Sequence, residues 1–224
     1  MKRLLVLLAL IPICLIGWSQ ELNIHFRNGQ EVKFDAKNIE FVEFTEKANN
    51  VSVNFGDAVD LGLSIKWASC NVGATSPEEF GDKHAWGELN HRGTYFQPQY
   101  YLYYDTDNDC YISIGKDIGG TDFDAAHVKW GGKWRMPTYE ELKELKDKCN
   151  WEWTKLSDVN GFLVSSSNGN SIFFPCGSST IYIWASGEYN QSHADAIAFG
   201  HGIQYSNYCC DKWSGGYVRP VMPY

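Results

Sequence analysis

The stretch Trp134-Arg135-Met136-Pro137-Thr138-Tyr139-Glu140-Glu141 decides how the second half of the chain folds. Thr138 is followed three residues later by Glu141, the capping-box pattern in which each side chain accepts a backbone N–H at the start of a helix. Leu142, Leu145 and Cys149 follow at spacings of three and four residues, so they share one helical face. The stretch therefore predicts a helix over 139–149 that packs against a core.

The residues just before this helix are expected to have structural roles. Trp134 is expected in the core, and Pro137 with Thr138 is expected to set the helix start. We expect Arg135 to bind backbone carbonyls or a nearby carboxylate, rather than an anionic ligand. Arg219, near the end of the chain, is expected to act in the same way at the closing strand.

Further from this helix, turn-rich segments alternate with short apolar runs. Upstream, Ser76-Pro77-Glu78-Glu79 has a capping Ser, Pro at the first helical position and an acid three residues after the cap, which predicts an earlier helix. Downstream, the runs that predict strands are 161–164, 171–175, 181–184, 196–199 and 216–219. Two helices followed by strands are typical of an α+β fold with a mostly antiparallel sheet.

The segment before this domain is β-rich. Apolar residues alternate on both sides of Asn28-Gly29, which predicts a β-hairpin because both turn positions need positive φ. Ile39, Phe41 and Phe44 predict a further strand or a tight wrap. An isolated hairpin is barely stable in water, so it is expected to dock on something. The chain is thus divided into a hairpin lead-in at 20–46, a linker at 47–57 and a domain at 58–224.

The first nineteen residues have the pattern of a cleaved secretory signal, 1–19. Lys2-Arg3 precedes the apolar run 4–16, and small residues stand at the −3 and −1 positions of a cut after Ser19. The alternative is a lipoprotein anchored at Cys14, which the bulky Ile13 disfavours. We expect an exported protein that is secreted, periplasmic or at the cell surface, without an integral membrane segment after cleavage.

The net charge bears on the class of partner, and the cysteine content bears on disulfide bonding. The 224 residues carry a net charge of −8. Loss of the signal makes the remaining chain more negative, because it removes Lys2 and Arg3. Such a chain is not attracted to phosphate backbones, which disfavours nucleic acid as a partner. Six cysteines remain after cleavage. At most one or two disulfides are expected, with buried free thiols as the alternative.

A series of motifs recurs in order along residues 58–222. They are DLGLSIKWA at 60–68, CNVGA at 70–74, EEFGD at 78–82, AWGE at 85–88, DAAHV at 124–128, WRMPT at 134–138 and YVRPV at 217–221. This string resembles the Fibrobacter succinogenes major paralogous domain family of exported proteins. The resemblance implies a C-type-lectin-like fold, in which the first and last strands lie together, two helices flank the sheet and a long irregular region presents ligand. It also implies a distant relation to formylglycine-generating enzymes, although fold does not carry function.

Two polar clusters have some features of metal or catalytic sites but lack essential parts. Residues 105–109 have the oxygen-rich spacing of a calcium loop, but Cys110 and Lys116 stand where an EF-hand needs Gly and Glu. A solvated turn is expected there, with a family-specific calcium site as the alternative. His193, Asp195 and His201 have no accompanying nucleophile motif, and His127 is expected to be structural. We therefore expect no metal, no cofactor and no catalytic residue.

Residues 182–213 are the expected ligand-binding region, since they mix rigid aromatics with small polar groups as binding loops do. Where they depart from the family's polar pattern, most residues are reachable from an Asn codon by changing its first two bases, among them Ala185, Gly200, Cys209 and Cys210. This is the signature of a diversity-generating-retroelement target, with ordinary drift in a surface loop as the alternative. The candidate ligand-binding residues are Tyr182, Ile183, Tyr189, His193, Asp195, His201, Tyr205, Tyr208, Asp211 and Trp213.

Together these features predict an exported, non-enzymatic binding module whose C-terminal loops contact a protein or carbohydrate ligand. Composition does not choose between the two, because planar aromatics stack on sugars as well as on protein groups. The first alternative is a structural component of a surface or fimbrial assembly, in which 21–46 adds a strand to a neighbour. The second is a formylglycine-generating-like enzyme, which would need a reactive cysteine or a metal.

Overall fold

The computed structural model describes residues 21–25, 31–35, 56–90, 97–200 and 203–224. The predicted signal at 1–19 and the further strand expected around Ile39, Phe41 and Phe44 lie outside the described residues. The chain separates into two compact units, 1–49 and 50–224, and the division falls inside the predicted linker.

The first unit contains the predicted β-hairpin. Strand β1 (Glu21–His25) pairs antiparallel with β2 (Glu31–Asp35). In the register Leu22 lies opposite Phe34 and Ile24 lies opposite Val32. The hairpin is confirmed, while the connecting residues 26–30, with Asn28-Gly29, lie outside the described part.

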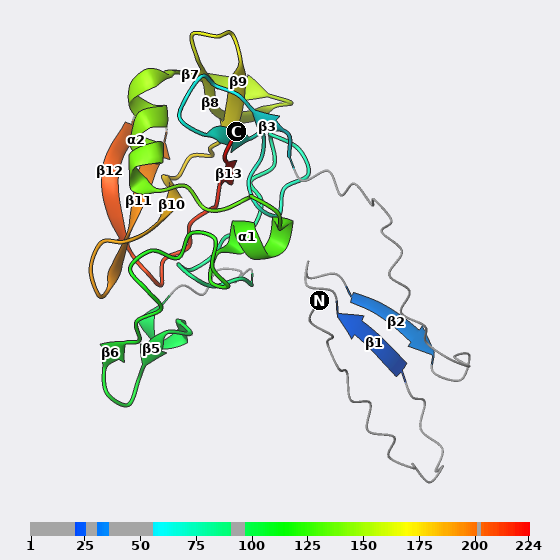
Figure 1. Ribbon diagram of the computed structural model, residues 1–224, viewed down its shortest axis with the longest axis vertical. Coiled ribbons are helices and arrows are strands. Elements are labelled where there is room, and N and C mark those ends of the chain that lie inside the picture. Colours follow the sequence, from blue (N-terminus) through cyan, green and yellow to red (C-terminus); the bar gives the residue numbers. More distant parts are fainter. Residues whose placement is uncertain (1–20, 26–30, 36–55, 91–96, 201–202) are drawn as a thin grey trace. The chain divides into compact units, whose positions relative to one another are not determined.

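The second unit is α+β, as predicted, with several small antiparallel sheets (Figure 1). Its sheets have the strand orders β13-β4-β3, β5-β6, β7-β8-β9 and β10-β11-β12. The elements are β3 (Ala58–Val59), β4 (Lys66–Ala68), the 3-10 helix η2 (Pro98–Tyr100), β5 (Tyr104–Asp105), β6 (Cys110–Tyr111), α1 (Ala125–Trp130), α2 (Tyr139–Lys148), β7 (Asn150–Leu156), β8 (Val159–Ser165), β9 (Ser171–Pro175), β10 (Ile181–Glu188), β11 (His193–Gly200), β12 (Ile203–Asp211) and β13 (Val221–Met222).

Helix α2 begins with the capping box that its sequence predicts. The Thr138 side chain accepts the Glu141 N–H, and the Glu141 carboxylate accepts the Thr138 N–H at 2.8 Å. Leu142 and Leu145 are fully buried in the core. The helix ends at Lys148 with Cys149 as its C-cap, in agreement with the prediction.

The helix predicted to begin at Ser76 is wrong. Residues 76–79 form a single turn, closed by a hydrogen bond from the Glu79 N–H to the Ser76 carbonyl. The Glu79 carboxylate accepts the Thr75 N–H at 2.7 Å, and Gly81 at φ +75° diverts the chain. Helix α1 begins much later, where the Asp124 carboxylate accepts the N–H groups of Ala126 and His127.

The sheet β10-β11-β12 separates two apolar clusters. Ile183 and Ile197 lie opposite each other in the register and pack with α2 and the β7-β8-β9 sheet. Trp184 and Ala196 are the next opposed pair and pack on the other side, against the core that includes α1. Strands alternate their side chains between faces, so one sheet serves both cores.

The strands predicted at 161–164, 171–175, 181–184 and 196–199 are confirmed as parts of β8, β9, β10 and β11. Residues 216–219 instead make only isolated bridges, at Gly216 and Tyr217. Strand β13 follows them and pairs antiparallel with β4, so the start and the end of the second unit lie together.

The two arginines act as the sequence predicts. Arg135 donates to both carboxylate oxygens of Glu141, at 2.8 and 2.6 Å, and to the Met136 carbonyl. Arg219 has no exposed surface and donates to three acceptors: the Asn71 side chain, the Ala68 carbonyl and the Phe173 carbonyl. Trp134 is half-buried and packs edge-on against Trp130, with ring centroids 5.1 Å apart.

Candidate binding surface

The region 182–213 is largely a sheet rather than the loops that we expected. Strands β10, β11 and β12 cover most of it, and the turn at 189–192 joins β10 to β11. Small residues such as Ala194 and Cys210 fill its covered face. Because such residues give no strong apolar alternation, the sequence predicts only the short strands 181–184 and 196–199 here and not the full sheet.

One candidate ligand residue is wrong. Ile183 has no exposed surface and belongs to the core beside α2, so it cannot touch a ligand without unpacking the sheet. Three of the positions proposed as variable, Ala185, Gly200 and Cys210, are also buried. Free variation at these positions would change core volume, which costs stability.

Five further candidates do not belong to one exposed cluster in the described part of the chain. Tyr182 is partly buried and packs against the apolar cluster that includes α1. Asp195 is half-buried, and burial raises the pKa of its carboxyl group. His201 lies outside the described residues. Tyr205 and Tyr208 belong to β12, but their side chains lie outside the described part.

The remaining four candidates, Tyr189, His193, Asp211 and Trp213, gather at one end of the sheet and are called here the turn surface. Tyr189 is 62% exposed, and the other three are half-buried. His193 lies opposite Asp211 in the register, and its Nε2 is 3.3 Å from an Asp211 carboxylate oxygen. These four of the ten candidate residues therefore lie in one neighbourhood.

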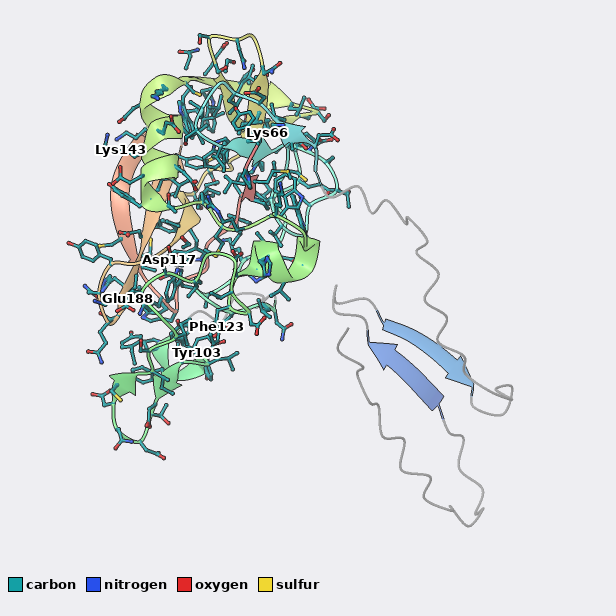
Figure 2. All side chains as sticks on the ribbon, viewed as in Figure 1. Lys66, Tyr103, Asp117, Phe123, Lys143 and Glu188 are labelled. Atoms are coloured by element: carbon teal, nitrogen blue, oxygen red, sulfur yellow. The ribbon has the colours of Figure 1, made fainter. Side chains whose placement is uncertain are left out.

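A buried lysine holds the turn surface in place. The Lys212 Nζ donates to the Gln191 carbonyl at 3.0 Å, lies 3.4 Å from the Glu188 carboxylate and sits 4.9 Å from the Trp86 ring centroid. Burial lowers the pKa of this ammonium, whereas the Glu188 carboxylate opposes that shift. Figure 2 shows Glu188 near Asp117, consistent with the bridge between Asp117 and Gly187.

Ser192, His193 and Asp211 are arranged in the order of a hydrolytic triad. The Ser192 Oγ lies 2.8 Å from the His193 Nδ1, and the His193 Nε2 faces Asp211. However, the Asn190 Oδ1 lies 3.2 Å from the same Nδ1 and also accepts the N–H groups of Ser192 and His193. A carbonyl oxygen only accepts, so the contact with Asn190 is a hydrogen bond in the tautomer with a proton on Nδ1, and in that tautomer Nδ1 does not take the Ser192 proton. The Asn190 side chain closes the turn through its bonds to the Ser192 and His193 N–H groups.

The sequence interpretation missed a second element of this surface, residues 97–114, called here the tyrosine hairpin. It comprises η2, β5 and β6, and Tyr104 lies opposite Tyr111 with their rings packed edge-on at 5.1 Å. Burial raises the pKa of Tyr111, and two residues of the turn surface lie close enough to influence it: the Asp211 carboxylate raises it further and the Trp213 side chain lowers it. The hairpin and the turn surface are therefore continuous.

The tyrosine hairpin is anchored at its base. The Tyr101 hydroxyl donates to the Trp86 carbonyl at 2.8 Å, and the Leu102 N–H donates to the Glu88 carboxylate at 2.8 Å. Tyr103 packs edge-on against Phe123 with ring centroids 5.5 Å apart, and Figure 2 shows the two rings together. The only sequence signal for this element is the density of tyrosines around 105–109.

The stretch considered as a calcium loop is the tip of this hairpin. The Asp105 carboxylate accepts the N–H groups of Asp107 and Asn108 and the Asn108 side-chain amide. The Tyr104 hydroxyl donates to Asp109, which raises the pKa of Tyr104 to about 12. Among the described residues, no group of three or more His, Cys, Asp or Glu side chains is placed to hold a metal ion.

The six cysteines after the predicted signal are free thiols in the structure. Burial raises the pKa of Cys70, Cys149 and Cys176, and raises that of Cys210 to about 12. Since the thiolate is the reactive form, these four are poor nucleophiles.

Comparison with known proteins adds no relative. No family model, no curated protein and no solved structure matches this chain. Within the described residues, none of the helices has the length and apolar character needed to cross a membrane.

Proposed function

We propose that this chain is an exported, non-catalytic binding protein whose ligand contacts the turn surface together with the tyrosine hairpin. The observation that carries the proposal is that Tyr111 of the tyrosine hairpin lies beside Trp213 and Asp211 of the turn surface. It brings aromatic rings, carboxylates and the exposed Tyr189 to one end of the sheet. Tyrosine and tryptophan supply large, rigid contact area at low entropic cost, which favours binding.

The proposal includes a C-type-lectin-like fold. It is supported by the antiparallel pairing of β13 with β4, which joins the two ends of the second unit, and by the two helices beside small sheets. Export is supported by the sequence pattern of 1–19. A non-catalytic role agrees with the raised pKa values of four thiols and with the contact of the His193 Nδ1 to the Asn190 side-chain oxygen, which competes with Ser192 for the same nitrogen.

A binding screen with matched variants tests the proposal. The mature chain is offered to a printed glycan array and to a displayed library of random peptides, alongside the variant Tyr189→Ser/Asp211→Asn/Trp213→Ala and the control Leu156→Ser. Leu156 is exposed on β7 and belongs to neither part of the proposed surface.

We expect ligands that bind the native protein and the control but not the triple variant, with the thermal unfolding midpoint of the triple variant checked separately. If the triple variant loses its fold, Tyr189→Ser/Asp211→Asn takes its place, because both side chains reach solvent. Ligands that bind the folded variant as well as the native chain would place the site elsewhere.

A further inference from the structure

The tyrosine hairpin carries a concentration of exposed apolar side chains. Six large hydrophobic residues are exposed in the described part of the chain, and three of them, Tyr100, Leu102 and Ile112, lie within this hairpin at 52%, 62% and 50% exposure. Single exposed apolar residues are ordinary on protein surfaces, whereas a cluster marks a contact surface. The hairpin therefore carries three large apolar side chains that folding of the described residues leaves exposed.

These side chains stand on a fixed backbone. The Ile112 N–H donates to the Tyr103 carbonyl at 2.8 Å, so Leu102 and Ile112 flank the same point of the ladder. The Leu102 N–H donates to the Glu88 carboxylate, which fixes the backbone at this position. A surface that is already ordered loses little conformational entropy on binding, which favours affinity.

The charge of the hairpin is of one sign. The tyrosine hairpin, residues 97–114, contains Asp105, Asp107 and Asp109 and no Lys, Arg or His. Asp107 and Asp109 are exposed. The Asp211 carboxylate also lies close enough to Tyr111 to raise its pKa. An apolar surface bordered by carboxylates and tyrosine rings is complementary to Lys or Arg side chains that alternate with apolar ones.

We propose that the tyrosine hairpin contacts a partner protein, through a segment of that partner that carries Lys or Arg among apolar side chains. This inference rests on the proposed function and names the ligand class for the same surface. A glycan would leave Leu102 and Ile112 without an apolar partner and would not balance the three hairpin carboxylates. A basic, apolar polypeptide segment satisfies both requirements.

The test uses the same random-peptide library on the full mature chain and determines the sequences of the enriched clones. Two variants probe the hairpin: Leu102→Ser/Ile112→Ser for the apolar contact and Asp107→Asn/Asp109→Asn for the charge. Their matched controls are Leu156→Ser and Asp158→Asn, which change exposed residues on and after β7. Asp158 has φ +66° and Asp109 has φ +52°, conformations that Asn tolerates as well as Asp does.

We expect clones enriched in Lys or Arg beside apolar residues, and affinity at least about tenfold weaker in each hairpin variant than in its control. Affinity should also fall as salt is raised, because the charge contact is exposed and screened. Enriched peptides that are acidic, or that bind both hairpin variants normally, overturn the inference. Ligands found only on the glycan array overturn it as well but leave the proposed function standing. Failure of the proposed function gives a different result, namely ligands that bind the turn-surface variants as well as they bind the native chain.

Discussion

Replacement of Arg219 by methionine is expected to destabilise the second unit more than most single changes. The guanidinium is fully buried, donates to three acceptors at 2.8 to 3.0 Å and lies 4.2 Å from the Phe174 ring centroid. Methionine keeps much of the volume and removes every donor. Each buried acceptor left without a donor costs about 1–3 kcal/mol, and removing a buried charge offsets part of the sum. We therefore expect the free energy of unfolding to fall by about 3–5 kcal/mol.

Urea unfolding followed by tryptophan fluorescence measures this loss, with the slope against urea compared between variants. Arg219→Lys is the control, because it keeps the positive charge but cannot reproduce the planar fork that reaches three acceptors. It should lie between the native protein and Arg219→Met. A loss below about 1 kcal/mol in Arg219→Met, at an unchanged slope, would refute the claim that the hydrogen bonds of Arg219 to Ala68, Asn71 and Phe173 stabilise the second unit.

Three further predictions follow from local contacts. Thr138→Ala removes the side-chain half of the capping box and should lower the free energy of unfolding by about 1 kcal/mol in the same urea assay, whereas no change would contradict the cap. The Tyr224 hydroxyl donates to Asp60, which lowers the pKa of Asp60 and raises that of Tyr224 to about 12. The stability that the lowered pKa of Asp60 contributes is present above about pH 4 and is lost as the pH falls below that value. The stability that the raised pKa of Tyr224 contributes is present below about pH 10 and is lost between about pH 10 and 12. Tyr224→Phe removes the bond, so it should flatten a plot of the unfolding midpoint against pH at both its acidic and its alkaline end. The buried thiols of Cys70, Cys176 and Cys210 should react with a thiol reagent at pH 8 only after unfolding, and fast labelling of the folded protein, mapped by mass spectrometry, would contradict their burial.

The parts of the fold that the sequence predicted are those that local chemistry determines. The capping box at Thr138 needs only residues within one helical turn, and the strands around Phe162 and Phe174 are continuous apolar runs. The same local reasoning failed at Ser76 because Glu79 bonds Thr75 instead of completing a helical cap. A pattern that can be satisfied within one turn does not require a helix.

The candidate site was predictable only in part. Tyr189, His193, Asp211 and Trp213 are close in sequence, so their shared neighbourhood could be inferred. The contact between Tyr111 and Trp213 joins distant segments and depends on how the hairpin docks, which no local pattern encodes. Ile183 was included in the ligand set because it stands in the segment 182–213 at a position where the resembled family is polar. In a strand, alternate residues point inward, and that position faces the core.

The most direct test of the binding surface is amide hydrogen exchange on the full mature chain, with and without the tightest ligand from the glycan and peptide screens. The binding proposal predicts slower exchange in two segments at once, 99–112 and 189–213, with residues 150–175 unchanged. Protection confined to 150–175 or to the first-unit hairpin at 21–35 would contradict the proposed surface.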